Sequence, residues 1–225
     1  MTNKAHAEGG TKEKLLAAAS RVFSEKGFLA ATVREICQLA GANIAAVNYH
    51  FGDKKHLYEA VLKNMLEDCG CANAKSIDPN LPVEERITVF IHEVTRDIYG
   101  DPDPDEDRGQ LSAIFHMELA HPSETWPQLI EEHLAVDSLL LRGMIAEMLG
   151  PDADPELVRQ SCISIYGMMT HHALCWPIVS VIHKDHPDPC AFRERLAEHV
   201  SRFALAALRS IAEDLRASRA SKDRT

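Results

Sequence analysis

The chain has 225 residues, 45% of them hydrophobic and 26% charged, and its formal net charge is −10. This size and composition allow one or two domains with a sizeable core, while the longest apolar stretches are shorter than the ~20 residues that a membrane-spanning helix needs. The acidity argues at first against nucleic acid as a partner. It lies in residues 71–225, however, which hold fifteen Lys or Arg against twenty-six Asp or Glu, whereas residues 1–70 hold nine against eight.

Residues 1–10, MTNKAHAEGG, have neither helical periodicity nor the apolar segment of a secretion signal. A flexible arm is predicted there, and a cytoplasmic location for the protein. Alanine, leucine, glutamate and arginine dominate the rest of the chain, and no strand-like alternation is present. The predicted fold class is therefore all-α.

Residues 32–57, TVREICQLAGANIAAVNYHFGDKKHL, predict two short helices joined by a tight turn and followed by a third helix. Thr32 and Glu35 have the spacing of a capping box, so the first helix is expected to begin there. Gly41 can adopt the left-handed conformation that ends a helix, and Asn43 can cap the next one. A three-residue connection between two such helices is typical of a helix-turn-helix motif.

The second helix of the motif, expected at about 44–51, has one face that could read DNA. Val47 is expected to pack on the first helix, while Ala45, Asn48 and Tyr49 point outward. A small side chain lets the backbone approach base edges, and asparagine offers a donor and an acceptor to adenine. A good bidentate contact of this kind is worth roughly 1–3 kcal/mol of discrimination.

Neighbouring residues complete the predicted interface with double-stranded DNA. Ile44 could face either the groove or the core, and Tyr49, His50 and Lys54 carry donors that suit phosphates. Asp53 is expected to cap the third helix, whose first amides could also bind a phosphate. The predicted DNA-binding residues are Thr32, Asn43, Ile44, Ala45, Asn48, Tyr49, His50 and Lys54.

The sequence AGANIAAVNYHFGDKKHL, preceded by TVREIC and by LLAAASRVFSEKGF, resembles the N-terminal domain of the TetR family of bacterial transcriptional regulators. The resemblance covers about residues 11–66, although Asn43 and Ile44 differ from the family's usual Ser or Thr and Lys. NYHFGDKKHLYEAVL and MELAHPSETWPQLIEEHL are similar to the subgroup typified by the regulator CecR. These resemblances imply a dimeric, ligand-responsive repressor, and the second implies control of efflux or membrane-transport genes.

The remainder of the chain predicts further helices. The periodicity and the Pro, Gly and acidic caps place them from Leu81-Pro82 to about 98 and at 108–120, 124–149, 154–175 and 189–216. The acidic segment 100–107 lacks the glycine and the bidentate glutamate of a calcium loop, so a solvated loop is expected. The predicted divisions are an arm at 1–10, a helix-turn-helix DNA-binding domain at 11–70, a ligand-binding and dimerisation domain at 71–217 and a flexible tail at 218–225.

The last two helices are the predicted dimer interface. The segment 158–176 is apolar around nearly its whole circumference, and the final helix has a long apolar stripe from Phe192 to Leu215. Together they could form half of an intermolecular four-helix bundle, whereas in a monomer they would simply form the core. In a dimer, two recognition helices would bind a palindromic operator with half-sites ~34 Å or a multiple apart. A ligand that changed their separation would release the operator.

Candidate effector-binding residues combine methionines, aromatic rings and isolated polar groups, all of which can equally be core or locally hydrogen-bonded residues. They are Phe115, His116, Glu118, Met144, Met148, Met168, His171, His172 and Trp176. His171 and Cys175 share a helix face but are too few for a metal site, so no metal and no cofactor are predicted. The six cysteines are expected to be reduced packing residues.

Three other functions remain as alternatives. A redox- or metal-responsive regulator of the same fold would lose operator binding with thiol oxidants or chelators. A helical enzyme could use His171, His172 and Glu118 for acid-base work, but no nucleophile motif or phosphate loop is present and the protein is not expected to be an enzyme. A module that binds only other proteins would have no affinity for DNA.

Overall fold

The structure, a computed structural model, describes residues 10–68, 77–99 and 108–222. Every regular element within these ranges is a helix, which confirms the all-α fold class. The chain divides into two compact units, and these are described separately. Of the described residues, unit 1 contains 10–68 and 108–130, and unit 2 contains 77–99 and 131–222.

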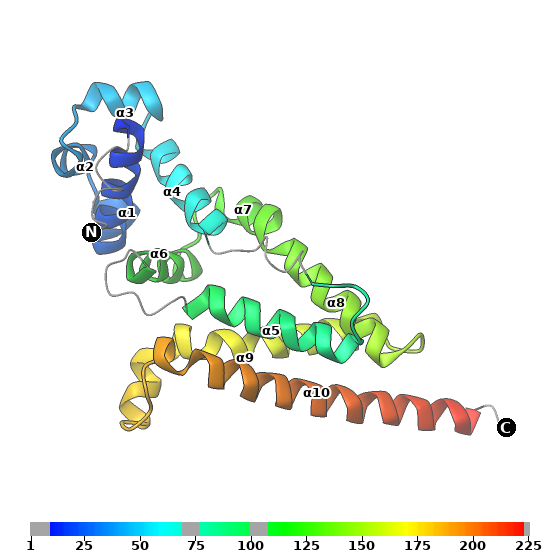
Figure 1. The fold of residues 1–225 in the computed structure, drawn as a ribbon. Helices are drawn as coiled ribbons and strands as arrows, with labels where there is room; N and C mark the ends of the chain where they lie inside the picture. Colours follow the sequence, from blue (N-terminus) through cyan, green and yellow to red (C-terminus); the bar gives the residue numbers. More distant parts are fainter. Residues whose placement is uncertain (1–9, 69–76, 100–107, 223–225) are drawn as a thin grey trace. The chain divides into compact units, whose positions relative to one another are not determined.

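Unit 1 is built around its first helix. Its helices are α1 (Thr11–Ala30), α2 (Val33–Ala40), α3 (Ile44–His50), α4 (Lys54–Asp68), α6 (Arg108–Ala120) and the first part of α7 (Trp126–His133) (Figure 1). Helix α1 packs against α2, α3, α4 and α6, and its Leu15 and Phe23 are fully buried. Gly27 has a φ of 72°, where a side chain would be strained, and interrupts the helical backbone near the end of α1.

The division between the units differs from the predicted one at residue 70. Helix α6 packs on α1 and belongs to unit 1, whereas the sequence suggested that residues 71–217 form one C-terminal domain. The buried side chains of Ile114 and Glu118 hold α6 there. Local periodicity could not reveal this partner because it lies far away in the sequence.

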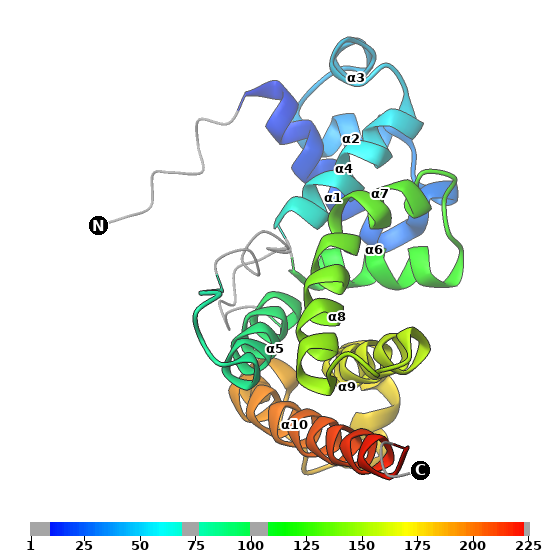
Figure 2. The ribbon, with the colours of Figure 1, turned by 90° about the vertical axis from the view of Figure 1, so that its right-hand side faces the viewer.

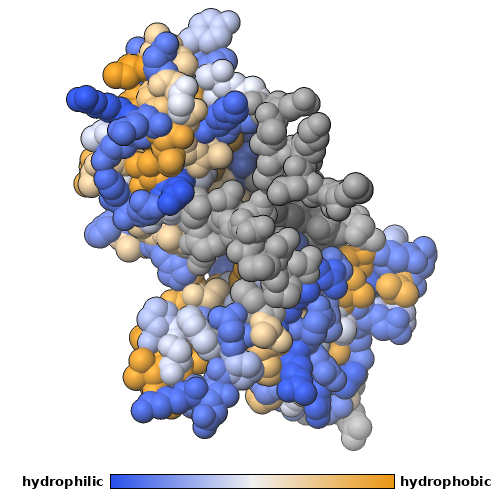
Figure 3. Space-filling model, turned by 60° about the vertical axis from the view of Figure 1, so that its left-hand side comes forward, coloured by the Kyte–Doolittle hydropathy of each residue, from blue (hydrophilic) through white to orange (hydrophobic). Residues whose placement is uncertain are grey.

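Unit 2 contains four long helices that all contact one another: α5 (Val83–Tyr99), α8 (Ala135–Leu149), α9 (Pro155–Ile182) and α10 (Pro189–Lys222) (Figure 2). The core between them includes Phe90, Leu141, Met169 and Val200, one from each helix, all with at most 2% exposure. The apolar stripe predicted for the final helix, α10, is confirmed, because Leu196, Val200 and Leu208 lie in this core. On the face drawn in Figure 3, hydrophobic residues form separate groups among hydrophilic ones.

Several predicted helix boundaries were wrong. The segment 124–149 forms two helices, because a turn at Leu134 separates α7 from α8. Helix α9 continues through Pro177 to Ile182 instead of ending at 175, and α10 continues to Lys222, into the predicted tail. A proline removes one backbone donor, but burial of Val179 beyond it stabilises the last turns of α9. The predicted loop at 100–107 lies outside the described residues.

Helix α9 is also long and apolar enough, by length and composition, to cross a membrane. Four of its residues, Val158, Cys162, Ile165 and Met169, are buried in the core of unit 2. A core helix of a helical bundle has the same composition, because it is apolar on more than one side.

Candidate nucleic-acid interface

The start of α2 is held by the predicted capping box. The Thr32 hydroxyl accepts a hydrogen bond from the Glu35 amide at 3.2 Å, and the Glu35 carboxylate accepts one from the Thr32 amide at 3.1 Å. Lys26 also donates to this carboxylate. Hydrogen bonds from Lys26 and then from Thr32 lower the pKa of Glu35 to about 2. The hydroxyl of Thr32 is therefore used within the protein to fix the first helix of the motif.

The turn between α2 and α3 has the predicted geometry. Gly41 has a φ of 64°, in the left-handed region, and the Ala42 amide donates to the Cys37 carbonyl at 2.9 Å. The Asn43 side chain then accepts a hydrogen bond from the Ala46 amide at 2.9 Å and caps α3. These bonds set the direction of α3 relative to α2, and the helix-turn-helix motif is present as the sequence predicts.

Helix α3 exposes the face that the sequence predicts. Val47 is fully buried, whereas Ala45 and Asn48 are exposed and Tyr49 is 85% exposed. Ile44, left open between groove and core, is 51% exposed and so lies on the outward side. These exposed side chains are the ones for which the sequence predicts contacts with bases and phosphates.

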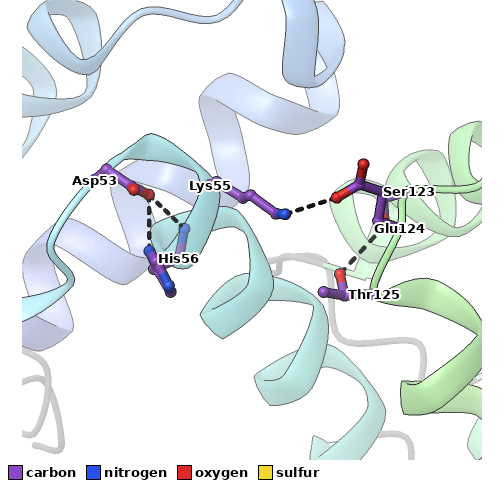
Figure 4. A network of polar contacts seen from close by, with 6 residues as sticks. All are labelled: Asp53, Lys55, His56, Ser123, Glu124 and Thr125. Carbon is purple, nitrogen blue, oxygen red and sulfur yellow. Dashed lines mark hydrogen bonds and ion pairs between the residues drawn. The ribbon is translucent and has the colours of Figure 1, made fainter.

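The third helix, α4, begins with the predicted aspartate cap. Asp53 accepts hydrogen bonds from the His56 amide and the His56 ring, both at 2.9 Å (Figure 4). These two bonds, the amide first, lower the pKa of Asp53. Lys55 forms a 2.8 Å ion pair with Glu124, which follows α6 in the chain. The first turn of α4 is thus fixed both by its own cap and by a contact with a distant segment.

Lys54 and His50 make contacts within the protein that the sequence did not suggest. The Lys54 ammonium lies 4.6 Å from the centre of the Phe28 ring and 3.4 Å from the Leu29 carbonyl oxygen. The His50 ring is half-buried, with its centre 5.0 Å from that of Tyr49. Binding of a phosphate by Lys54 would therefore exchange contacts with the end of α1 for contacts with DNA.

Tyr58 and Glu118 form a buried pair in unit 1 that sequence reasoning missed. The Tyr58 hydroxyl donates to the Glu118 carboxylate at 2.7 Å, and the Ser123 amide and hydroxyl donate to it at 2.9 and 2.8 Å. Burial, and then this carboxylate, raise the pKa of Tyr58. Glu118, a candidate effector-binding residue, is 2% exposed and hydrogen-bonded within unit 1. The pair is separated by 60 residues, so no local spacing could have revealed it.

The other candidate effector-binding residues are divided between the units. Phe115 and His116 lie on α6 in unit 1, where the Phe115 ring is 5.5 Å from that of Trp126. Met144 and Met148 are buried core residues of unit 2, and Met168 packs against that core.

Three candidates lie toward the C-terminal half of α9. His171 is exposed, while His172 lines a cavity of about 500 Å³. The Trp176 ring lies 6.1 Å from that of His186, which lines the same cavity.

Two cysteines, Cys37 and Cys162, are buried as packing residues are. Burial raises the pKa of the Cys37 and Cys162 thiols, which disfavours the reactive thiolate. Within residues 10–68, 77–99 and 108–222, no three His, Cys, Asp or Glu side chains are grouped so that they could hold a metal ion. Cys69 and Cys71 lie outside these ranges.

Two family descriptions match the chain. Residues 15–61 match "Bacterial regulatory proteins, tetR family", which covers the helix-turn-helix described above. Residues 83–208 match "HTH-type transcriptional dual regulator CecR, C-terminal domain", which covers more than half of the chain.

Curated relatives agree with both matches. The chain is 30% identical over 167 residues to the dual regulator CecR of Shigella flexneri, a match that covers 73% of this chain and 64% of that protein. It is 35% identical over 65 residues to the repressor NicS of Pseudomonas putida, covering 29% of this chain and 31% of that protein. The matches thus span less than two thirds of the length of these relatives. Both of these proteins are transcriptional regulators.

Solved structures agree on the fold. The fatty acid degradation regulator FadR of Bacillus halodurans superposes with a TM-score of 0.62 at 18% identity, covering 86% of this chain and 96% of that one. FadR of Bacillus subtilis gives a TM-score of 0.61 at 19% identity, covering 84% and 97%. The two family matches show that the chain belongs to the TetR family of bacterial regulatory proteins and has a CecR-type C-terminal domain.

Proposed function

We propose that the protein is a transcriptional regulator that binds a palindromic DNA operator as a homodimer and is released by a small-molecule effector. The observation that carries this proposal is the geometry of α3, which is capped by Asn43, anchored by the buried Val47 and exposed at Ala45, Asn48 and Tyr49. Such a helix can enter the major groove and present side chains to base edges.

The exposed face of α9 supports a dimer. Ile163, Ile178, Val181 and Ile182 are 56–67% exposed although all are large aliphatic residues, and Phe203 of α10 is 59% exposed. Leaving these side chains in water is unfavourable, and pairing the same helices of two protomers about a two-fold axis would cover them. The two α3 helices would then bind the two half-sites of a palindrome.

Unit 2 is the place proposed for the effector. Its core contains Met144, with Met168 packed against it, and methionines adapt to irregular ligands. The buried hydroxyl oxygen of Thr95 has no hydrogen-bond partner among the described residues. A bound molecule with one polar group could satisfy that oxygen. Similarity to CecR suggests that the regulated genes encode efflux or membrane-transport proteins.

The direct test is fluorescence anisotropy with the purified full chain and labelled duplexes taken from immediately upstream of its own gene. Titrations at two salt concentrations separate phosphate attraction from base reading, because the former weakens steeply with salt. The proposal is supported if one palindromic fragment binds tightly and still binds better than a random duplex at the higher salt concentration. If no upstream duplex binds better than random sequence, a genome-wide binding selection with the purified protein would follow, and absence of any selected sequence there would reject the proposal.

A further inference from the structure

A cavity of about 500 Å³ lies on unit 2 between α9, the segment that follows it and the first turns of α10. Its volume is within the range of small-molecule sites. The cavity is lined by His172, His186, Phe192, Arg195, Leu196, Glu198, His199 and Arg202. The lining does not include the exposed aliphatic residues of α9 that would be covered in the proposed dimer, which are Ile163, Ile178, Val181 and Ile182.

The lining is strongly basic for such an acidic protein. Two arginines and three histidines face one carboxylate, Glu198, in a chain whose net charge is −10. Each of Arg195, Glu198, His199 and Arg202 lies three or four residues from two of the others, which places these side chains on one helix face. Neither arginine is ion-paired with another residue in the part of the chain that the structure describes. Both guanidinium groups are therefore available to an anion.

Aromatic rings form another part of the lining. The centre of the His186 ring lies 5.2 Å from that of His172, 4.8 Å from that of Phe192 and 6.1 Å from that of Trp176. Nδ1 of His186 is 2.9 Å from the Pro187 carbonyl oxygen, which can only accept, so Nδ1 carries the proton and donates. This packing and this bond hold the His186 ring in place, and Phe192 and Leu196 add apolar surface.

His172 also lines the cavity, and one of its ring nitrogens makes no hydrogen bond to the described part of the chain. Its Nδ1 is buried and has no hydrogen-bond partner among the described residues. Burial, and then the neighbouring imidazoles of His186, His171 and His199, lower the pKa of His172, so the cavity holds fewer positive charges when it is empty. An anion would reverse this effect, because it favours the protonated form of every imidazole around it.

From these contacts we infer that the cavity is a binding site for a small organic anion, a phosphate or carboxylate with an apolar part. Arg195 and Arg202, which are about two turns apart on α10, hold the charged group, as guanidinium groups do with planar or tetrahedral oxyanions. The apolar part lies against Phe192, Leu196 and the ring of His186. This inference concerns binding alone and does not depend on the proposed operator recognition.

The experiment is isothermal titration calorimetry of the full chain with hexyl phosphate. One site per chain is expected, and hexan-1-ol, which has the same tail without the charge, binds at least about tenfold more weakly. Arg195→Gln and Arg202→Gln each weaken binding by about tenfold, while Arg216→Gln, a neutralised arginine on the same helix outside the cavity, leaves it unchanged. Far-UV circular dichroism verifies that the variants fold, which is expected because both lining arginines are exposed.

Fluorescence then locates the anion. The chain has two tryptophans, so Trp126→Phe leaves Trp176 as the reporter beside His186. Its emission is expected to change with the same affinity as in the calorimetry. The inference is overturned by absence of saturable heat up to about 10 mM hexyl phosphate, by binding that Arg195→Gln and Arg202→Gln leave unchanged, or by an equal loss in Arg216→Gln.

Discussion

The hydroxyl of Tyr58 on α4 lies 2.7 Å from a carboxylate oxygen of Glu118 on α6, and both side chains are buried. Tyr58 also packs its ring against those of Phe23 and Phe28, with ring centres 4.8 and 5.0 Å apart. The helix that follows the helix-turn-helix is therefore joined to a segment from the second half of the chain. Lys55 and Glu124 add a second, exposed link between the same regions.

Tyr58→Phe should destabilise unit 1 by about 1–3 kcal/mol, because the buried carboxylate of Glu118 loses a donor while the ring packing is kept. Thermal and urea unfolding followed by circular dichroism would measure the loss. Tyr49→Phe removes the same hydroxyl from a tyrosine that is 85% exposed, and it should leave stability unchanged. Equal stability of the two variants would show that the Tyr58 hydrogen bond contributes nothing to folding.

Asn48→Ala should reduce the preference for one base pair of the operator by roughly 1–3 kcal/mol, because the side chain that offers both a donor and an acceptor to a base edge is lost. Tyr49→Ala should instead weaken binding to operator and random duplex alike, since a phosphate contact carries no sequence information. Anisotropy titrations with operators substituted at each position distinguish the two. The base-reading role of Asn48 is rejected if its removal weakens all duplexes equally.

The capping box of α2 should contribute to stability in a pH-dependent way. The pKa of Glu35 is lowered from an ordinary value of 4.5 to about 2 in the folded protein. Because the carboxyl pKa is lower in the folded than in the unfolded protein, the ionised Glu35 stabilises the fold fully above the unfolded pKa. This stabilisation is lost as the pH falls from 4.5 to the folded pKa of about 2.

Glu35→Gln should therefore be less stable than the parent above pH 4.5, and the difference should shrink as the pH approaches 2. Urea unfolding at a series of pH values would show this convergence. Glu25→Gln, which removes a carboxylate from an exposed ion pair with Arg21, is the matched control. A stability difference for Glu35→Gln that stays constant over the whole range would contradict the folded pKa.

Ile178→Glu should convert the proposed dimer to a monomer, because two charged side chains would be brought together where aliphatic surface is buried. Leu139→Glu is the matched control: Leu139, on α8, is also a large aliphatic residue at 61% exposure. Sedimentation equilibrium of both variants measures the association, and anisotropy shows whether operator binding is lost with it. If the Ile178→Glu variant remains dimeric, this face of α9 is not the dimer interface.

The local structure of the helix-turn-helix motif follows from the sequence alone. The caps of these helices are local: the capping box of Thr32 and Glu35, the left-handed Gly41 and the N-cap Asn43 all bind partners within four residues along the chain. Their spacing was therefore enough to predict both helices and the turn. The outward position of Asn48 and the burial of Val47 follow from the helical period in the same way.

Only the tertiary structure decided which distant segments meet. It placed α6 beside α1, paired Tyr58 with Glu118, and engaged Lys54 with the end of α1. It also separated the candidate effector-binding residues between two units and brought His172 close to His186 and to α10. Helical periodicity shows that one face of a helix is apolar, but it does not show which other helix covers that face. The partner depends on packing between residues far apart in the chain.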